Sequence, residues 1–164
     1  QSSFIVTQTD MFACVVTGAP LTNLPSMYNI LYKSTGNTNQ GIIETSQGRF
    51  GKDVYPMKDL ELYVSQSPMH HAAKITTPFM ILHGTEDGAV DWNQGLEFYT
   101  SARRLGKQVI LLSYPGEPHH LRKEENQKDF LLRMKQYFDH YCKGTPAPDW
   151  MVNGIPFLKK KFKK

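Results

Sequence analysis

Two short polar clusters of the sequence bring together residue types that catalyse nucleophilic hydrolysis. The first contains Asp87 and follows the apolar run 79–82, and the second contains His119 and follows the apolar run 109–112. A carboxylate beside an imidazole fixes the tautomer of the ring and stabilises the imidazolium that forms when the ring accepts a proton. The two residues would therefore supply the acid and the base of a catalyst whose nucleophile lies elsewhere.

Each of these residues also has an ordinary interpretation when it is taken alone. Asp87 could cap the helix that is expected to start near Trp92, and His119 could be a plain loop histidine. The pair is more specific than either member, because both lie at the ends of strands in one expected sheet.

The elements that must position the pair follow from the pattern of apolar residues. Strands are predicted from short apolar runs that end at glycine or proline, and helices from apolar residues spaced by three and four. In chain order they are a strand over 12–17, a short helix over 26–33, a helix beginning at 67, a strand over 79–82, a helix over 92–105, a strand over 109–112 and a helix over 124–143.

This alternation predicts an α/β fold, with a small parallel sheet and helices on its flanks. Reactive groups of such sheets collect on the loops that leave the carboxyl ends of the strands. The helix between the second and third strands returns the chain to the same edge. We therefore expect Asp87 and His119 to meet within hydrogen-bond distance although they are far apart in sequence.

Composition places the chain among globular proteins and excludes several classes of function. It has 164 residues, of which 40% are hydrophobic, which is enough for one packed domain. Five lysines lie in the last six residues, and without them the formal charge of +4 becomes −1. The basic tail is interpreted as a solvated chain end, so neither nucleic acid nor a membrane is an expected partner. No apolar run is long enough to span a membrane.

Metal and cofactor chemistry is not expected either. The histidine pairs 70–71 and 119–120 are sequence neighbours whose side chains point apart, and no H-x-x-x-H motif or cysteine ligand set accompanies them. No glycine-rich phosphate loop is present. The two cysteines, Cys14 and Cys142, are too few for a disulfide framework and are expected to be buried free thiols.

The motifs themselves resemble a known family. The stretch 67–78, the motif ILHGTEDGAV at 81–90 and the motif YPGEPH at 114–119 resemble the carboxyl-terminal part of the catalytic domain of the prolyl oligopeptidase family, and are most similar to its dipeptidyl-peptidase and acylaminoacyl-peptidase-like branch. The resemblance covers nearly all of the chain. It implies part of an α/β-hydrolase domain, usually preceded by a β-propeller, with a triad in the order Ser, Asp, His.

By this resemblance Asp87 is the triad acid and His119 the general base, with His120 as the second choice for the base. The 164 residues contain no G-x-S-x-G motif. We therefore expect residues 1–164 to be the carboxyl-terminal portion of a catalytic domain, with the nucleophile upstream of residue 1. Residues 145–164 are expected to form an extension that ends in the basic tail, and the chain alone should be inactive.

The resemblance also implies residues that bind substrate. Tyr28 and Tyr32 have the spacing of two tyrosines that wall a proline pocket in the dipeptidyl-peptidase branch, and they would share a face of the helix over 26–33. Plain aromatic packing is an equally good interpretation. Val90 is assigned to substrate binding by its place in the motif, whereas Ala89 stands where some dipeptidyl peptidases have an asparagine.

The function that these features imply is that of a serine-type peptidase, dipeptidyl or oligopeptidyl and proline-selective if the tyrosine assignment holds. A carboxylesterase-like hydrolase and a non-catalytic binding module are the alternatives. Its expected partners are a peptide substrate, the rest of its own catalytic domain and an N-terminal β-propeller. An unpaired sheet edge favours self-association into a homo-oligomer. The compartment is not fixed by the sequence, with periplasmic or extracellular slightly favoured over cytoplasmic.

Overall fold

Three parallel strands form the sheet that organises the structure. The structure is a computed structural model that describes residues 1–33 and 35–154. The strands are β1 (Val15–Gly18), β2 (Phe79–Gly84) and β3 (Val109–Tyr114), in the order β1-β2-β3. The α/β class and the parallel sheet are confirmed. The first strand begins three residues later than predicted, and the other two run on to Gly84 and Tyr114.

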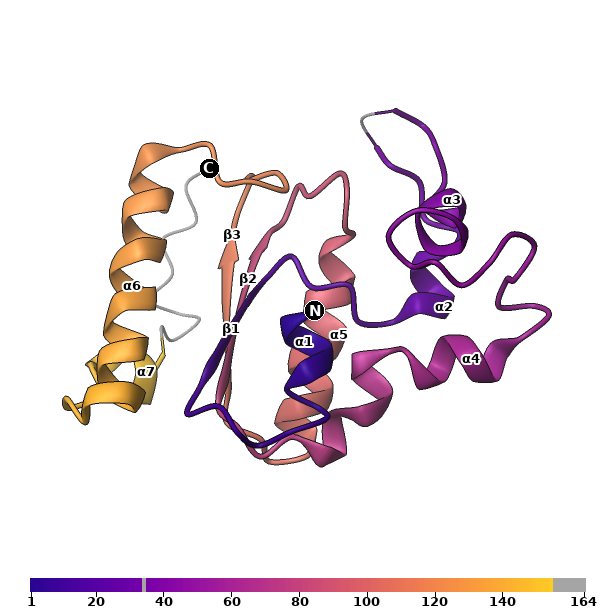
Figure 1. Ribbon diagram of the computed structural model, residues 1–164. Helices are drawn as coiled ribbons and strands as arrows, with labels where there is room; N and C mark the ends of the chain where they lie inside the picture. Colours follow the sequence, from indigo (N-terminus) through magenta and orange to yellow (C-terminus); the bar gives the residue numbers. More distant parts are fainter. Residues whose placement is uncertain (34, 155–164) are drawn as a thin grey trace.

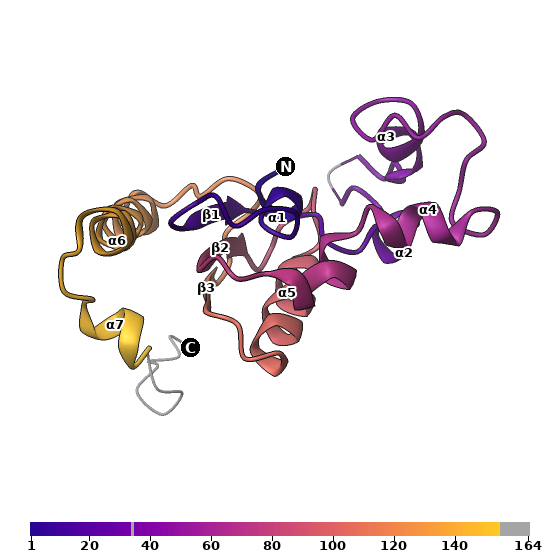
Figure 2. The ribbon, with the colours of Figure 1, turned by 60° about the horizontal axis from the view of Figure 1, so that its bottom comes forward.

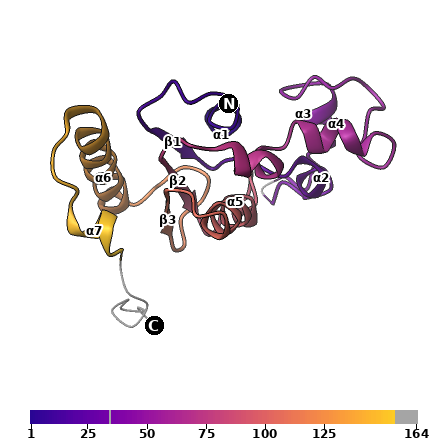
Figure 3. The same cartoon turned by 90° about the horizontal axis from the view of Figure 1, so that it is seen from below.

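Two long helices pack on opposite faces of this sheet, as the alternation predicted. The helix α5 (Trp92–Arg104) connects β2 to β3, and α6 (Glu124–Lys143) follows β3. Figure 3, a view from below, shows the sheet between them. The remaining helices are short: α1 (Ser2–Ile5), α2 (Leu24–Met27), α3 (Gln40–Glu44), α4 (Leu60–Ser65), the 3-10 helix η1 (Pro68–Lys74) and α7 (Asp149–Val152).

The side chains of β2 show how the strands divide the core. Phe79 and Ile81 point into the cluster on the α5 face, where Phe98 and Ala102 of α5 are fully buried. Met80, between them in sequence, points to the opposite face. This alternation is the normal pleat of a strand, and burial on both faces explains why the run contains no polar residue.

The face toward α6 is packed mainly by aromatic and sulfur-containing side chains. Tyr137 of α6 is buried against Met80 and Cys14, and Tyr141 packs beside it. Cys14 is buried as expected, but Cys142 is exposed, so the prediction of two buried thiols is wrong for Cys142. Cys142 lies in the last turn of α6, next to the end of the helix.

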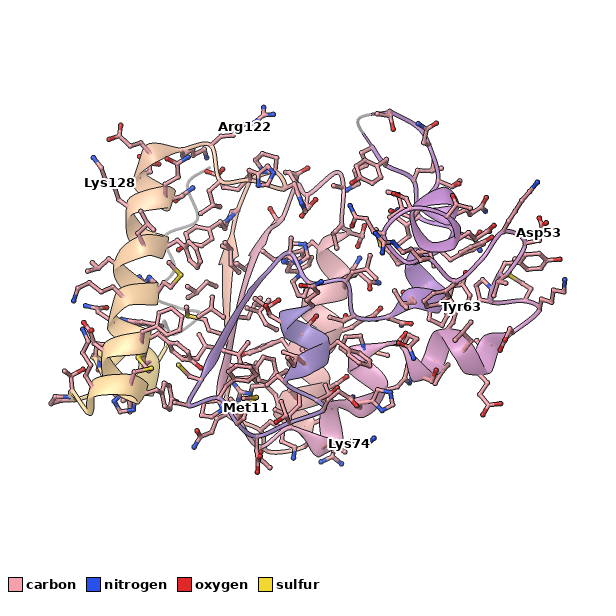
Figure 4. The ribbon with its side chains drawn as sticks, viewed as in Figure 1. Met11, Asp53, Tyr63, Lys74, Arg122 and Lys128 are labelled. Atoms are coloured by element: carbon pink, nitrogen blue, oxygen red, sulfur yellow. The ribbon has the colours of Figure 1, made fainter. Side chains whose placement is uncertain are left out.

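The segment between β1 and η1 leaves the sheet and forms a small cluster of its own. Tyr28, Ile43 and Tyr63 are buried together there, and the three short helices α2, α3 and α4 surround them. Figure 2 shows this excursion on the side of the sheet opposite to α6, and Figure 4 shows Tyr63 among its side chains. Gln94 of α5 anchors its start, because its side-chain oxygen accepts hydrogen bonds from the backbone of Thr22 and Asn23.

The helix predicted over 26–33 is wrong. The helix α2 begins at Leu24, with a proline in its first turn, and ends at Met27. The chain then turns so that Leu31 pairs with Thr38 in an isolated antiparallel bridge. Contacts within the excursion therefore override the local helical spacing.

Within the described residues no helix is both long and apolar enough to cross a membrane. The basic tail, for which a solvated chain end was predicted, lies outside the described residues, apart from the segment 145–154 that leads to it.

The packing of α5 on the sheet makes a testable prediction. Phe98 is fully buried and its ring lies 5.1 Å from that of Phe79. Phe98→Ala should lower the free energy of unfolding by about 3–5 kcal/mol, because it removes buried apolar area and leaves a cavity. Urea denaturation measures this. Phe138→Ala is the matched control, since Phe138 is 38% exposed on α6, and an equal loss in the two variants would contradict the assignment of this core.

Candidate active site

The loop that follows β2 holds a buried carboxylate. Asp87 is 1% exposed, and its Oδ1 atom accepts hydrogen bonds from the backbone N–H groups of Ala89 (2.8 Å) and Val90 (2.9 Å). The cap of α5 is Asp91, whose side chain accepts from the backbone of Asn93. The helix cap is therefore Asp91 and not Asp87. The Oδ2 atom of Asp87 can accept hydrogen bonds from other groups.

The histidine of the next loop lies beside that oxygen. The Nδ1 atom of His119 is 2.9 Å from Oδ2 of Asp87, so the expected hydrogen bond between the two clusters is present. The side chain of His119 is 37% exposed, whereas that of Asp87 is fully buried. His120 packs its ring against that of His119, with 4.8 Å between the centroids, and is exposed. Of the two neighbouring histidines, His119 is the one held by the acid.

Strand register explains how residues so far apart in sequence meet. Gly84 of β2 is level with Tyr114 of β3, so the two strands end together and their loops leave side by side, at the top of the sheet in Figure 1. The loops are joined by hydrogen bonds from Glu86 N–H to the Glu117 carbonyl and from Gly116 N–H to the hydroxyl of Thr85.

Gly84 is required for this close approach. A Cβ atom added there would lie 2.2 Å from the carbonyl oxygen of Glu117 and 2.5 Å from that of Pro118. Any larger residue would push the histidine loop away from the end of β2 and from Asp87.

A second buried carboxylate holds the histidine loop from the other side. Glu117 is fully buried, and its oxygens accept hydrogen bonds from the backbone N–H groups of Arg122 and Lys123 and from the side chain of Asn126. These bonds, of which that from Arg122 N–H contributes most, lower the pKa of Glu117. The loop is thereby tied to the start of α6, where Arg122 is labelled in Figure 4.

The charge of Asp87 is stabilised by its surroundings. Burial by itself acts to raise the pKa of this carboxyl group, but hydrogen bonds from His83, His119, Ala89 and Val90 outweigh burial and lower the pKa to about 2. Asp87 is therefore ionised at neutral pH and can stabilise a positive charge on the His119 ring.

A cavity of about 390 Å³ adjoins the exposed ring of His119. It lies at the carboxyl ends of the strands and is lined by residues of β1, β2 and the histidine loop, among them Gly18, Ala19, Leu82 and His120. The ring of His119 is therefore accessible from the cavity, and a reacting group could approach the ring nitrogen that does not face Asp87.

The residues assigned to substrate binding lie in different places. Tyr28 is buried, and its hydroxyl donates to the carboxylate of Glu44 in the excursion cluster. Tyr32 lies beyond the end of α2, so the expected shared helix face is absent, and neither tyrosine lines the cavity beside His119. Val90 is at the site, where its backbone binds Asp87 through N–H.

Two residues that matter to the geometry were not singled out by the sequence. Glu117 and His83 were each seen only as part of a motif and given no role, yet the Nε2 atom of His83 lies 3.3 Å from Oδ2 of Asp87. One signal could have indicated Glu117. The helix α6 has no capping side chain at its first residues, so its free N–H groups need an acceptor, and Glu117 precedes the helix by a few residues. No pattern in the sequence indicated His83. Among the described residues no group of three or more His, Cys, Asp or Glu side chains could hold a metal ion.

Relatives of the chain share both its sequence and its fold. Acylamino-acid-releasing enzymes of Sus scrofa and Arabidopsis thaliana are 31% and 29% identical to it, over 73% and 52% of the chain. These matches span only 16% and 11% of the two relatives, so the chain corresponds to a small part of their length.

Solved structures of the same kind superpose on the chain. An acylaminoacyl peptidase of Pyrococcus horikoshii gives a TM-score of 0.72 at 19% identity, covering 94% of this chain and 25% of that one. A puromycin-hydrolyzing peptidase of Mycobacterium tuberculosis gives 0.66 at 23% identity, covering 83% and 19%. This likeness shows the fold, which is part of an α/β-hydrolase fold.

A model of one family matches nearly the whole described chain. The match runs over residues 2–145, which include all three strands, the loop of Asp87 and the loop of His119. The chain belongs to the prolyl oligopeptidase family.

Proposed function

We propose that the protein to which this chain belongs is a serine peptidase, and that the chain supplies the acid Asp87 and the general base His119 of its triad. The observation that carries the proposal is the 2.9 Å hydrogen bond between Nδ1 of His119 and Oδ2 of a buried, ionised Asp87. Family membership supports the same reaction class.

The proposal gives each residue a chemical task. His119 donates its Nδ1–H to Asp87, which leaves Nε2 without a proton and able to accept one. A serine hydroxyl placed near Nε2 would transfer its proton there while its oxygen attacks a substrate carbonyl. The imidazolium so formed would protonate the leaving amine, which leaves an acyl group on the serine. Water would then give a proton to Nε2 and attack the acyl carbon, and the serine oxygen would leave and take that proton back. Asp87 remains ionised throughout and stabilises the charged ring.

The nucleophile is proposed to lie upstream of residue 1, because no G-x-S-x-G motif occurs among the 164 residues. The rest of the catalytic domain would pack beside β1 and complete the cavity around His119. We also propose a peptide as the substrate class and a β-propeller as the preceding domain, following the family resemblance.

Selectivity for proline receives no support from the two tyrosines. The hydroxyl of Tyr28 is held by Glu44, and its ring packs edge-on against Tyr63. The names of the relatives favour N-acylated peptides instead, and we propose these as the substrates to test first.

The activity test uses the full-length protein with acylaminoacyl, Gly-Pro and free aminoacyl p-nitroanilides and with the matching esters. His119→Ala and Asp87→Asn should each lower kcat by at least about a thousandfold, because the serine then lacks a correctly oriented base. His120→Ala is the matched control and should change kcat less than tenfold.

Three results would contradict the proposal. Full activity of His119→Ala would remove the assigned base. Hydrolysis of the esters but of none of the amides would identify an esterase, and no hydrolysis of any substrate would favour a binding module. The chain of residues 1–164 by itself should be inactive, and turnover that depends on His119 in this chain would place the nucleophile within it.

The ionised state of Asp87 makes a prediction about stability. On folding, its pKa falls from the ordinary value of 3.8 to about 2, so the carboxylate stabilises the fold above about pH 4, and this contribution is lost as the pH falls toward 2. The loss should be on the order of 2 kcal/mol. Urea denaturation at pH 7, 4, 3 and 2 should therefore show the wild type losing more stability than Asp87→Asn.

Asp10→Asn serves as the control for this measurement, since Asp10 is exposed and should leave the pH dependence unchanged. Parallel pH dependence of the wild type and Asp87→Asn would mean that the carboxylate is not stabilised by its hydrogen bonds.

A further inference from the structure

The end of β2 places a second histidine against the carboxylate of Asp87. His83 is fully buried, and its Nε2 atom lies 3.3 Å from Oδ2 of Asp87 and 3.1 Å from the carbonyl oxygen of Val90. Its backbone is fixed by the pairing of β2 with Ser113 of β3. His83 thus approaches the carboxylate from inside the sheet, whereas His119 approaches it from the exposed side.

The opposite edge of the His83 ring shows which tautomer the site accepts. Its Nδ1 atom is buried and has no hydrogen-bond partner. A Cβ atom added at Gly95 of α5 would lie 2.4 Å from Nδ1, so the backbone of α5 is packed directly on this edge. A proton on Nδ1 would be buried without an acceptor, which is costly. The edge that carries Nε2 is therefore the one through which the ring makes its polar contacts, with Val90 and with Asp87.

A histidine at this position contacts both the acid and the turn that holds it. Oδ1 of the carboxylate accepts hydrogen bonds from the N–H groups of Ala89 and Val90, and Oδ2 faces the rings of His119 and His83. Nε2 of His83 is hydrogen bonded to the carbonyl of Val90 at 3.1 Å and also lies 3.3 Å from Oδ2. The hydrogen bond from His83 is also among those that lower the pKa of Asp87.

We infer that His83 is a positioning residue of the active site, a buried ring that fixes the orientation of Asp87 toward His119 through its contacts with Oδ2 of Asp87 and with the carbonyl of Val90. Gly95 contributes to the same arrangement, because a glycine has no side chain and so leaves room for the His83 ring. The inference rests on the proposed function, since orientation of Asp87 matters to catalysis only if Asp87 is the triad acid.

The first experiment replaces the donor in the full-length protein. His83→Leu should lower kcat about tenfold with KM within twofold of the wild type, because the loss of the polar contacts of Nε2 with Val90 and Asp87 loosens the acid and not the substrate site. His83→Gln retains an N–H near the position of Nε2 and should recover kcat to within about threefold of the wild type. Titration of active serine with a fluorophosphonate normalises kcat to the amount of folded enzyme.

The second experiment moves the ring and keeps the donor. Gly95→Ala should force the His83 ring out of place and lower kcat by about the same factor as His83→Leu. Gly41→Ala is the matched control, because Gly41 also lies in a helix and has no atom within 4 Å of an added Cβ. It should leave kcat unchanged.

The outcomes separate this inference from the proposed function. If Asp87→Asn abolishes turnover while His83→Leu keeps the wild-type kcat, the inference is overturned and the proposed function stands. If His83→Leu and His83→Gln lose kcat equally, the role of His83 is structural packing, and the inference is again overturned. If Asp87→Asn retains full activity, the proposed function fails first.

Discussion

The carboxylate of Asp87 is a full negative charge that is almost completely removed from water, and the loops around it are arranged to satisfy that charge. Two backbone N–H groups hold one oxygen and two imidazole rings lie against the other. A buried charge is tolerated only where its hydrogen-bonding capacity is filled. The position of His119, the turn at Ala89 and Val90 and the orientation of His83 are therefore parts of one electrostatic arrangement.

The sheet makes this arrangement possible because parallel strands bring successive loops to one edge. β2 and β3 end level with each other, and Gly84 lets the backbone of the histidine loop rest directly on the end of β2. Glu117 then ties the far side of that loop to the start of α6. His119 is consequently positioned by two elements on opposite sides of its loop, which limits how far its ring can move.

Much of this could be predicted from the sequence because it depends on periodic features. The apolar runs, the helices α5 and α6 and the meeting of Asp87 with His119 follow from alternation and from the geometry of a parallel sheet. The helix over 26–33 could not be predicted correctly, because contacts of Tyr28 with Glu44 and Tyr63 decide where the chain turns. The roles of His83 and Glu117 depend on single contacts between distant segments, which no local pattern encodes.

The excursion touches the acid loop through a hydrogen bond from the backbone N–H of Lys33 to the carbonyl of Gly88. Its own apolar cluster is separate from the two clusters that pack on the sheet. A change in the length or surface of this cluster would therefore leave the packing of the sheet in place, and it would reach the loop of Asp87 through the contact between Lys33 and Gly88.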